Sequence, residues 1–345
     1  METTNTIYFC TTYYHTLITI IKALQSKEKF DVILCKSIPE YQSLKVKLDQ
    51  TGLFGSIYFY DTTAFLNKRK QSKFRSIIEK LFLVRRKCIA TVAEKYLPVD
   101  VLKYTNVYVY MDNHPFAYYL IYYKKNFHLI EDALDFFKYY VDYYHVNEKD
   151  YTPGTIRYLK RKLFGYFVWG NSPFVIDIEV NDLDGIKIPK DKVKVVPRKD
   201  LFSKLSEGEK LIIYNTYVRG ELTYNEKRGK TAVIFTQPLL KDKFVKDENE
   251  QLKVFECIAH DWFDKGYNLI LKPHPRDEID YTSIIKKYHI AFIDKNLPSE
   301  ILNFNPNFHF EVAVAITTTA INFLDYADEK IFLGWEYMNN ILENK

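Results

Sequence analysis

The sequence predicts an α/β protein made of two doubly wound domains, each with a mostly parallel sheet, that face each other across a cleft. Three observations support this class. A chain of 345 residues exceeds what one hydrophobic core usually covers. Short apolar runs alternate with segments of helical periodicity in both halves. Residues 181–197, between the halves, are polar and contain Asp184-Gly185 and Pro189. We therefore expect one domain of residues 1–185 and a second of residues 186–345.

The first half opens with an apolar strand followed by a helix, which is the start of a βαβ unit. The strand is expected at Thr6–Cys10 and the helix from Tyr13 to Leu24. Further apolar runs of strand length lie at Phe30–Leu34, Ile57–Tyr60, Val107–Met111 and Phe127–Ile130. This alternation predicts parallel strands joined by helical crossovers.

The second half contains six apolar runs of strand length. They are Leu211–Tyr214, Ala232–Phe235, Asn268–Lys272, Ile290–Ile293, Val312–Ile316 and Lys330–Leu333. Between the second and third runs, a stripe of apolar residues predicts a helix that ends at Gly266; the stripe is Leu252, Phe255, Ile258 and Trp262. The pattern again predicts a doubly wound sheet.

Composition limits the class of protein. With 47% hydrophobic and 27% charged residues, the chain can bury substantial cores. No apolar run approaches the roughly 18 to 20 residues of a membrane span, and the first four residues do not resemble a signal peptide. The cysteines are far apart and form no C-x-x-C pair; they are Cys10, Cys35, Cys88 and Cys257. We expect a cytoplasmic protein with reduced cysteines and no zinc site.

Positive charge is concentrated between Lys68 and Lys87, where nine Lys or Arg residues accompany a single acid, Glu79. Apolar residues recur there at helical spacing, which predicts an amphipathic basic helix. Such a helix can lie on the anionic inner face of the cell membrane, although a solvated basic face is the commoner meaning. The basic segment of residues 157–162 gives similar support for peripheral membrane association.

The segment Asn268–Arg276 runs from an apolar strand directly into a histidine between two prolines. Because proline restricts its own φ and the residue before it, Lys272 and His274 are confined to extended geometry at the carboxyl end of the strand. Ligands bind at that end of an open α/β sheet. We interpret His274 as presented to a ligand, with a structural loop histidine as the alternative.

Two adjacent acids, Glu131 and Asp132, follow an apolar strand in the first half. Adjacent carboxylates repel each other, so one can have a raised pKa and serve as a general base. An acidic helix start, capped by Asp132, is the alternative.

Two further features follow strands of the second half. Glu300 comes after Pro298-Ser299, where a carboxylate can accept both hydroxyls of a ribose; a helix start is the alternative. Thr317, Thr318 and Thr319 lie where an apolar strand meets a helix. Hydroxyls and free N–H groups there form a phosphate site, with ordinary capping as the competing account.

Together these motifs resemble the bacterial CMP-sialic-acid-dependent sialyltransferases of the lipooligosaccharide and capsule type, a GT-B-like family. That family has a paired-acid-Gly motif, a His-Pro motif and a later Ser/Thr pair. The matching segments here are Glu131-Asp132-Ala133, His274-Pro275 and Thr318-Thr319, the last starting 44 positions after the histidine. Thr236–Leu239 is also similar to a family segment. Ala133 replaces the family's glycine and would be strained if that position needs a positive φ.

The resemblance implies two Rossmann-like domains and an inverting transfer of sialic acid from CMP-sialic acid to a terminal galactoside of a bacterial surface glycan. It implies Asp132, with Glu131 as alternate, as the base for the acceptor hydroxyl, and His274 as the group that stabilises the departing phosphate. The donor-binding residues would be Gln237, Lys272, Pro275, Glu300, Thr317, Thr318 and Thr319. No cofactor and no metal is required in this scheme, and a homodimer is implied by analogy with the family.

The acceptor side is less defined. Tyr14 and His15 follow the first strand, and Asn113 and His114 follow a later one, so both loops are candidates for acceptor contacts. The sequence does not distinguish an α2,3, α2,6 or α2,8 linkage.

Two other functions stay open at this stage. One is a GT-B-like transferase that uses CMP-Kdo or a UDP- or GDP-sugar. The other is a non-catalytic, membrane-peripheral scaffold of polysaccharide assembly. Slow release of sialic acid from CMP-sialic acid without acceptor would distinguish the enzyme from the scaffold. Nucleic acid is not an expected partner, because no recognition motif accompanies the basic residues.

Overall fold

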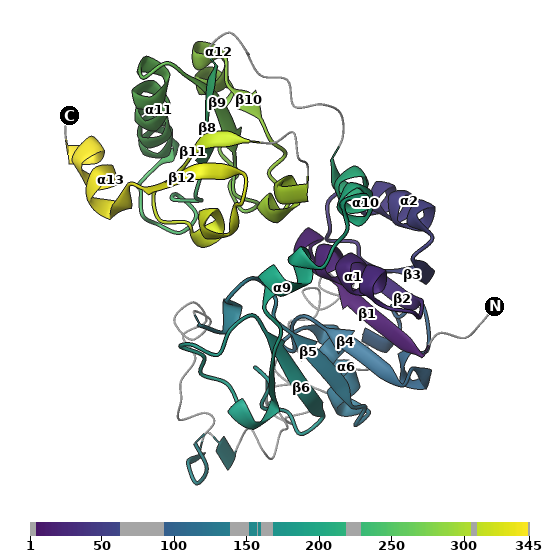
Figure 1. The fold of residues 1–345 in the computed structure, drawn as a ribbon. Coiled ribbons are helices and arrows are strands. Elements are labelled where there is room, and N and C mark those ends of the chain that lie inside the picture. The colour runs from purple at the N-terminus through teal and green to yellow at the C-terminus, as the bar shows by residue number, and fades with distance from the viewer. Residues whose placement is uncertain are drawn as a thin grey trace. The chain divides into compact units, whose positions relative to one another are not determined.

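The computed structural model describes residues 5–62, 93–138, 152–156, 158–159, 168–218, 229–304 and 309–343. The chain divides into two compact units, Met1–Ser206 and Glu207–Lys345, each with one parallel sheet (Figure 1). The α/β class with two doubly wound sheets is therefore confirmed. The first unit ends later than residue 185, where we expected the boundary, because the strand β7 (Val193–Val195) pairs with the first sheet.

The sheet of the first unit has seven strands in the order β3-β2-β1-β4-β5-β6-β7, and every pair is parallel. The strands before β7 are β1 (Thr6–Cys10), β2 (Phe30–Cys35), β3 (Phe54–Tyr60), β4 (Asn106–Val109), β5 (Phe127–Ile130) and β6 (Val175–Val180). The helices are α1 (Tyr13–Gln25), α2 (Tyr41–Thr51), η1 (Val101–Lys103), α6 (Pro115–Tyr122), η3 (Lys190–Lys192) and α9 (Arg198–Ser203). The order reverses between β1 and β4.

Burial explains why the first strand and helix form where they do. All five residues of β1 are buried, and Phe9 stacks on Phe116 of α6 with ring centroids 4.3 Å apart. α1 begins after Thr12, whose side chain accepts the backbone N–H of His15 at 3.2 Å. The turn between β1 and α1 is thus closed by a local cap at the carboxyl end of the strand.

The sheet of the second unit has five parallel strands in the order β10-β9-β8-β11-β12. They are β8 (Lys230–Phe235), β9 (Tyr267–Lys272), β10 (Ala291–Phe292), β11 (Phe310–Ala315) and β12 (Ala327–Phe332). The helices are α10 (Glu207–Tyr217), α11 (Glu248–Asp264), α12 (Thr282–Tyr288), η5 (Ser299–Phe304), η6 (Thr319–Phe323) and α13 (Gly334–Glu343).

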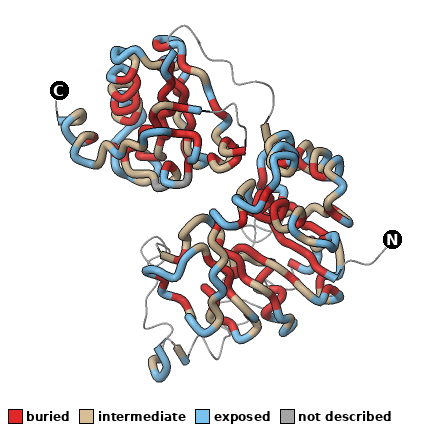
Figure 2. The backbone as a smooth tube through the Cα atoms, viewed as in Figure 1, coloured by how far each residue is buried: buried red, intermediate tan, exposed pale blue. Residues whose placement is uncertain are grey.

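Apolar clusters cover both faces of this second sheet, one with α11, α12 and α13 and the other with η5 and η6. Strands covered on both faces are buried along most of their length. In β8 and β9 every residue after the first is buried (Figure 2). The predicted helix is α11, and Gly266 follows it with a φ of 87° that favours glycine.

One predicted strand was wrong. Leu211–Tyr214 lies in α10, where Ile213 is buried while Leu211 and Ile212 are exposed. A strand of this sheet needs continuous burial, whereas only one face of α10 packs against other residues. The strands β6 and β7 were not predicted, because β6 lies beside the polar segment that we interpreted as a linker and β7 lies within it.

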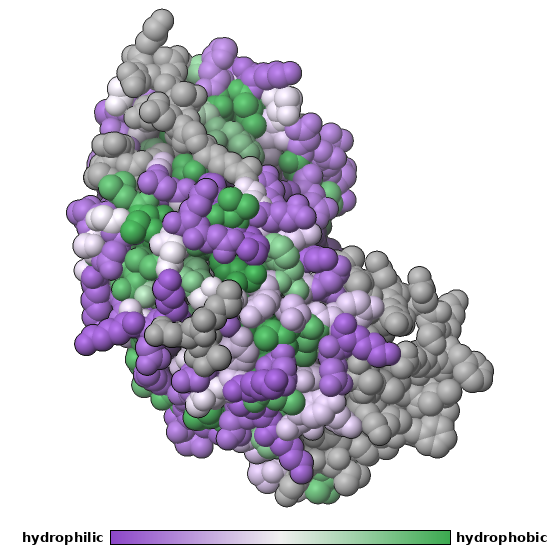
Figure 3. All heavy atoms as spheres, turned by 90° about the vertical axis from the view of Figure 1, so that its right-hand side faces the viewer, coloured by the Kyte–Doolittle hydropathy of each residue, from purple (hydrophilic) through white to green (hydrophobic). Residues whose placement is uncertain are grey.

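No helix in the described segments is long and apolar enough to cross a membrane. On the face shown in Figure 3, hydrophilic side chains surround smaller hydrophobic areas. The basic stripe of residues 68–87 lies outside the described residues, as does most of the basic segment of residues 157–162. Membrane association through them therefore stays a prediction.

Candidate active site

In each sheet the strand order reverses beside the first strand of the unit, between β1 and β4 and between β8 and β11. Ligands of doubly wound proteins bind outside the carboxyl ends of the strands at such a reversal. The candidate residues of the first unit follow β1, β4 and β5, and those of the second unit follow β8, β9 and β11 or lie in η5. Each unit therefore gathers its own candidates at one sheet edge.

Glu131 and Asp132 follow β5, but their carboxylates have different surroundings. The side chain of Glu131 is buried, and its two oxygens accept the backbone N–H groups of Phe137 at 3.1 Å and Asn181 at 2.9 Å. Burial raises the pKa of Glu131 to about 7, against the opposing effect of these amides. Glu131 therefore fastens its own loop and is poorly placed to meet a substrate.

Asp132 keeps 18% of its side chain exposed. Its Oδ1 lies 2.9 Å from Nε2 of His15, and no described residue contacts its Oδ2 within hydrogen-bond distance. His15 itself is fully buried, which does not fit the direct acceptor contact expected from the sequence. Of the paired acids, Asp132 is therefore the more accessible to solvent.

The alanine that replaces the family's glycine is not strained. Ala133 is not among the residues with positive φ, whereas Asp135 has a φ of 55°. The side chain of Asp135 accepts the Nδ2–H of Asn181 at 2.8 Å. The left-handed turn of this loop is thus at Asp135, two residues later than the comparison of motifs indicated.

The loop after β4 carries Asn113 and His114. His114 caps α6 by accepting the N–H of Phe116 on Nδ1 at 3.3 Å, and burial, followed by the nearby His15, lowers its pKa to about 3. The Oδ1 atom of Asn113 is buried and has no hydrogen-bond partner among the described residues. These two side chains are neutral polar groups at the point where the strand order reverses.

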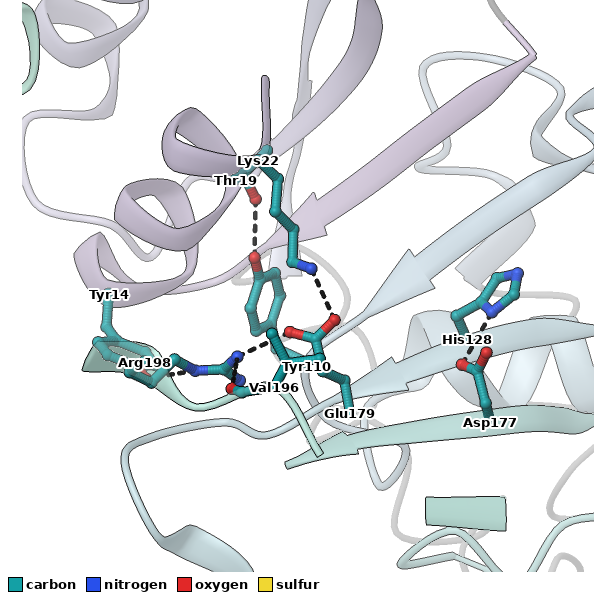
Figure 4. A network of polar contacts seen from close by, with 9 residues as sticks. All are labelled: Tyr14, Thr19, Lys22, Tyr110, His128, Asp177, Glu179, Val196 and Arg198. Atoms are coloured by element: carbon teal, nitrogen blue, oxygen red, sulfur yellow. Dashed lines mark hydrogen bonds and ion pairs between the residues drawn. The ribbon is translucent and has the colours of Figure 1, made fainter. Parts of the chain in front are cut away.

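A buried charge network joins α1 to β6 and to the start of α9 (Figure 4). Glu179 accepts Lys22 Nζ at 2.6 Å and Arg198 Nη1 at 2.7 Å, and Arg198 also donates through Nε to the hydroxyl of Tyr14 at 3.3 Å. This network was not predicted from the sequence. Its one signal was the pair of acids within the run Val175–Val180, of which Glu179 belongs to the network.

In the second unit, hydrogen bonds hold both the main chain and the ring of His274. The backbone N–H of His274 donates to Thr236 Oγ1 at 3.2 Å, and the ring Nδ1 accepts the backbone N–H of Arg276 at 3.0 Å. Burial lowers the pKa of His274 to about 4, and Arg276 and Lys272 add to this effect. The ring is therefore neutral near pH 7, with the proton on Nε2, and no described residue accepts it.

A buried hydroxyl and amide cluster supports this histidine loop. Asp277 accepts Tyr281 Oη at 2.8 Å and Gln251 Nε2 at 3.1 Å, and it also accepts the hydroxyl of Thr236. Since Thr236 in turn receives the N–H of His274, the cluster connects α11 to the histidine. Asp277 and Gln251 were not identified from the sequence, because their partners lie far away in the chain.

Gln237 and Thr317 join the two loops at the reversal of the second sheet. Gln237 Nε2 donates to Thr317 Oγ1 at 2.8 Å, and its Oε1 accepts the N–H of Thr317 at 2.9 Å. The hydroxyl of Thr318 accepts the N–H of Ala320 at 3.4 Å, and Thr319 begins η6. The loop after β11 therefore has both the hydroxyls and the helix start that the sequence predicted.

Lys272 does not reach outward as expected for a residue that contacts the nucleotide. Its Nζ is buried and donates to the carbonyl oxygens of Pro273 at 3.1 Å and Lys295 at 3.0 Å. Burial lowers the pKa of Lys272 to about 8, against the effect of Asp294 and Glu300, and burial raises the pKa of Glu300. Lys272 thus fastens the loop that leads to Glu300, while Pro275 is exposed beside His274.

Among the described residues, no three His, Cys, Asp or Glu side chains are grouped so that they could hold a metal ion. The candidate residues of the first unit include a carboxylate, and those of the second unit include neutral donors. A carboxylate can take a proton from a hydroxyl, and neutral donors can donate hydrogen bonds to a phosphate.

Comparison with known proteins bears on the family and the fold of this chain. The model of glycosyltransferase family 52 matches residues 60–333. An uncharacterised protein of Haemophilus influenzae is 29% identical over 280 residues, which are 78% of this chain and 80% of that protein. The GT-B domain of a sialyltransferase from Photobacterium damselae aligns with a TM-score of 0.51 and 14% identity, over 96% of this chain and 91% of that chain. This structural likeness shows a GT-B-like fold.

Proposed function

Since the chain belongs to glycosyltransferase family 52, we propose that it transfers sialic acid from CMP-sialic acid to a terminal galactoside of a bacterial surface glycan, with inversion at the anomeric carbon. Family membership confirms the resemblance that the motifs indicated and makes the chain a glycosyltransferase. The donor, the acceptor and the stereochemistry are the proposal. The solved sialyltransferase with a similar fold supports the choice of donor.

The proposed reaction needs a base for the acceptor hydroxyl. The proton of that hydroxyl passes to the Asp132 carboxylate, and the freed oxygen forms a bond to the anomeric carbon of sialic acid. The bond from that carbon to the phosphate oxygen breaks, and its electron pair leaves with CMP. Oδ2 of Asp132 is the atom proposed to take the proton, because Oδ1 is held by His15. A positioned base typically contributes about 10²–10⁴-fold.

The departing phosphate needs donors that are already in place. His274 offers Nε2–H, because the N–H of Arg276 occupies its Nδ1. This is the observation that carries the proposal for the donor side. A neutral, preoriented donor stabilises developing phosphate charge without reorganisation in the transition state. Thr317, paired with Gln237, and the loop of Thr318 and Thr319 are proposed to hold the same phosphate, and Glu300 the ribose.

The proposal is tested by incubating purified protein with CMP-sialic acid and lactose, with and without EDTA, and following CMP and product by mass spectrometry. We expect a sialylated product that EDTA does not abolish. Asp132→Ala and His274→Ala should each lower the rate at least about a hundredfold. The matched controls Asp49→Ala and His309→Ala remove exposed residues of the same types and should leave the rate unchanged.

The outcomes separate the alternatives. Release of CMP without transfer to lactose would support the donor and exclude lactose as acceptor. Activity with CMP-Kdo or a UDP- or GDP-sugar alone would replace the donor and keep the transferase. Absence of both turnover and CMP binding would contradict the cytidine-nucleotide proposal altogether.

A further inference from the structure

The protonation pattern of His15 follows from its two ring nitrogens. Nδ1 accepts the backbone N–H of Thr11 at 3.0 Å, and an amide nitrogen can only donate. The ring therefore carries its proton on Nε2. That nitrogen lies 2.9 Å from Oδ1 of Asp132 and 3.0 Å from the carbonyl oxygen of the same residue.

The single N–H of His15 thus bridges the side chain and the main chain of Asp132. This contact fixes the carboxylate relative to its own backbone and occupies one of its two oxygens. Because His15 is fully buried and both ring nitrogens are engaged, it has no nitrogen with which to take a proton from a substrate. Its effect on catalysis has to act through Asp132.

The surroundings of His15 hold the ring in place. The ring stacks on Tyr110 with centroids 4.2 Å apart and an interplanar angle of 6°, and the hydroxyl of Tyr110 lies 2.9 Å from Thr19 Oγ1. His114, the nearby histidine, has a pKa lowered to about 3 by burial and by His15, so it adds no positive charge beside the ring near neutral pH.

The helix that carries His15, α1, also contacts the strand β6 and the helix α9. Lys22 pairs with Glu179 of β6, and Gln25 donates to the carbonyl oxygen of Leu201 in α9 at 2.8 Å. Tyr14 accepts from Arg198 at the start of α9, as Figure 4 shows. These contacts at both ends of α1 restrict its movement along the sheet edge.

We propose that His15 is a positioning residue that holds Asp132 with Oδ2 directed to the acceptor hydroxyl, by donating one hydrogen bond from a ring whose tautomer the backbone of Thr11 determines. This inference rests on the proposed function, in which Asp132 is the base. It assigns to α1 a role in orienting the base and not in binding the acceptor.

The test compares His15→Phe, which keeps a flat ring against Tyr110, with His15→Gln, which restores a side-chain N–H. His15→Phe should lower kcat about ten- to hundredfold with the KM for CMP-sialic acid unchanged, because a misplacement of about 1 Å can cost this much. His15→Gln should recover about tenfold of the loss. In an Asp132→Asn background, His15→Phe should change kcat by less than about twofold, since both act through one group.

Several results would overturn the inference. They are an unchanged kcat in folded His15→Phe, equal losses in the Phe and Gln variants, or additive losses in the double variant. Circular dichroism and thermal melts of each variant separate misfolding from a loss of positioning. An effect on KM alone would instead indicate acceptor or donor binding.

A second readout does not depend on activity. Nitrogen-15 NMR of the histidine rings should show His15 with its proton on Nε2, and Asp132→Ala should change that signal. A proton on Nδ1 would contradict the inference even if the enzyme is active. If the wild-type protein transfers no sialic acid, the proposed function fails, and the NMR result still decides whether the His15–Asp132 hydrogen bond exists.

Discussion

Glu131 and Asp132 show at the residue scale how two adjacent acids can differ in use. Both follow the same strand, but Glu131 accepts from two backbone amides whereas Asp132 contacts a histidine. A carboxylate that already accepts from buried amides contributes to folding, whereas a partly exposed one with an unoccupied oxygen can exchange a proton with a substrate. The same residue type therefore serves structure at position 131 and is proposed to serve chemistry at position 132.

This difference predicts opposite outcomes for two alanine variants. Glu131→Ala should lower the free energy of unfolding by about 1–3 kcal/mol, because two backbone amides lose a buried acceptor. Its kcat, measured on folded protein, should stay within a few fold of wild type. Asp132→Ala should keep its stability and lose activity. Urea unfolding and initial rates on the same preparations check both statements, and a large fall in kcat for folded Glu131→Ala would make Glu131 the better candidate for the base.

At the scale of single elements, α1 carries both a residue that contacts Asp132 and a residue of the buried charge network. It carries His15 near its first turn and Lys22 near its last, and the second of these pairs with Glu179. Arg198 is almost completely buried beside the same carboxylate. A buried guanidinium left without its partner is costly, so this network keeps α1, β6 and the start of α9 together.

Glu179→Ala should therefore lower the free energy of unfolding at neutral pH by about 3–5 kcal/mol. The matched control Glu256→Ala breaks an exposed pair with Lys287 and should cost less than about 1 kcal/mol. Urea unfolding of both variants measures the difference. Equal costs for the two would show that burial does not strengthen the Glu179 network.

The same network has a predictable dependence on pH. Burial acts to raise the pKa of Glu179, but Lys22 and Arg198 outweigh it and hold that pKa below the ordinary value. A depressed folded-state pKa contributes stability above the unfolded pKa, and this contribution is lost as the pH falls through the folded pKa. The stability difference between wild type and Glu179→Ala should thus shrink as the pH falls from about 7 to about 3.

At the scale of the whole molecule, the sheets of both units share one topological feature. Each sheet reverses its order beside its first strand, and each reversal collects the residues that the proposed function uses. In the proposed function, the first unit provides the carboxylate of Asp132, and the second provides neutral donors such as His274 for a phosphate. Binding and proton transfer are thereby assigned to different units of the chain.

This division predicts which residues a bound nucleotide protects from hydrogen exchange. In hydrogen exchange of the full chain, CMP should protect residues 236–239, 273–277, 294–300 and 317–320, while residues 11–15 and 131–135 should exchange as before. Saturation at about a hundredfold over Kd should stabilise the binding unit by about 2.7 kcal/mol. UMP at equal concentration is the control. Protection confined to the first unit, or equal protection by UMP, would contradict the assigned cytidine site.

The sequence alone predicted the parts of the fold that depend on neighbouring residues. Buried strands such as β8 and β9 contain short apolar runs, Ala232–Phe235 and Leu269–Leu271, and α11 has a clear stripe and a glycine stop. The run Leu211–Tyr214 was wrongly predicted as a strand, because a short apolar run does not by itself distinguish a strand from a helix that buries one face. The strand β6 was missed because two acids interrupt its apolar pattern, and one of them is the Glu179 of the buried network.

The sequence by itself determined the family resemblance and the strand ends at which His274, the paired acids and the threonines lie, because proline restraint and apolar runs act over a few neighbouring residues. Only the tertiary structure decided that Glu131 is fastened in a loop, that Lys272 is buried, and that His15 contacts Asp132. Those properties depend on burial and on hydrogen bonds between groups far apart in the chain, such as His15 and Asp132, which are 117 positions apart. Folding brings these groups together, and no local pattern records which of them will meet.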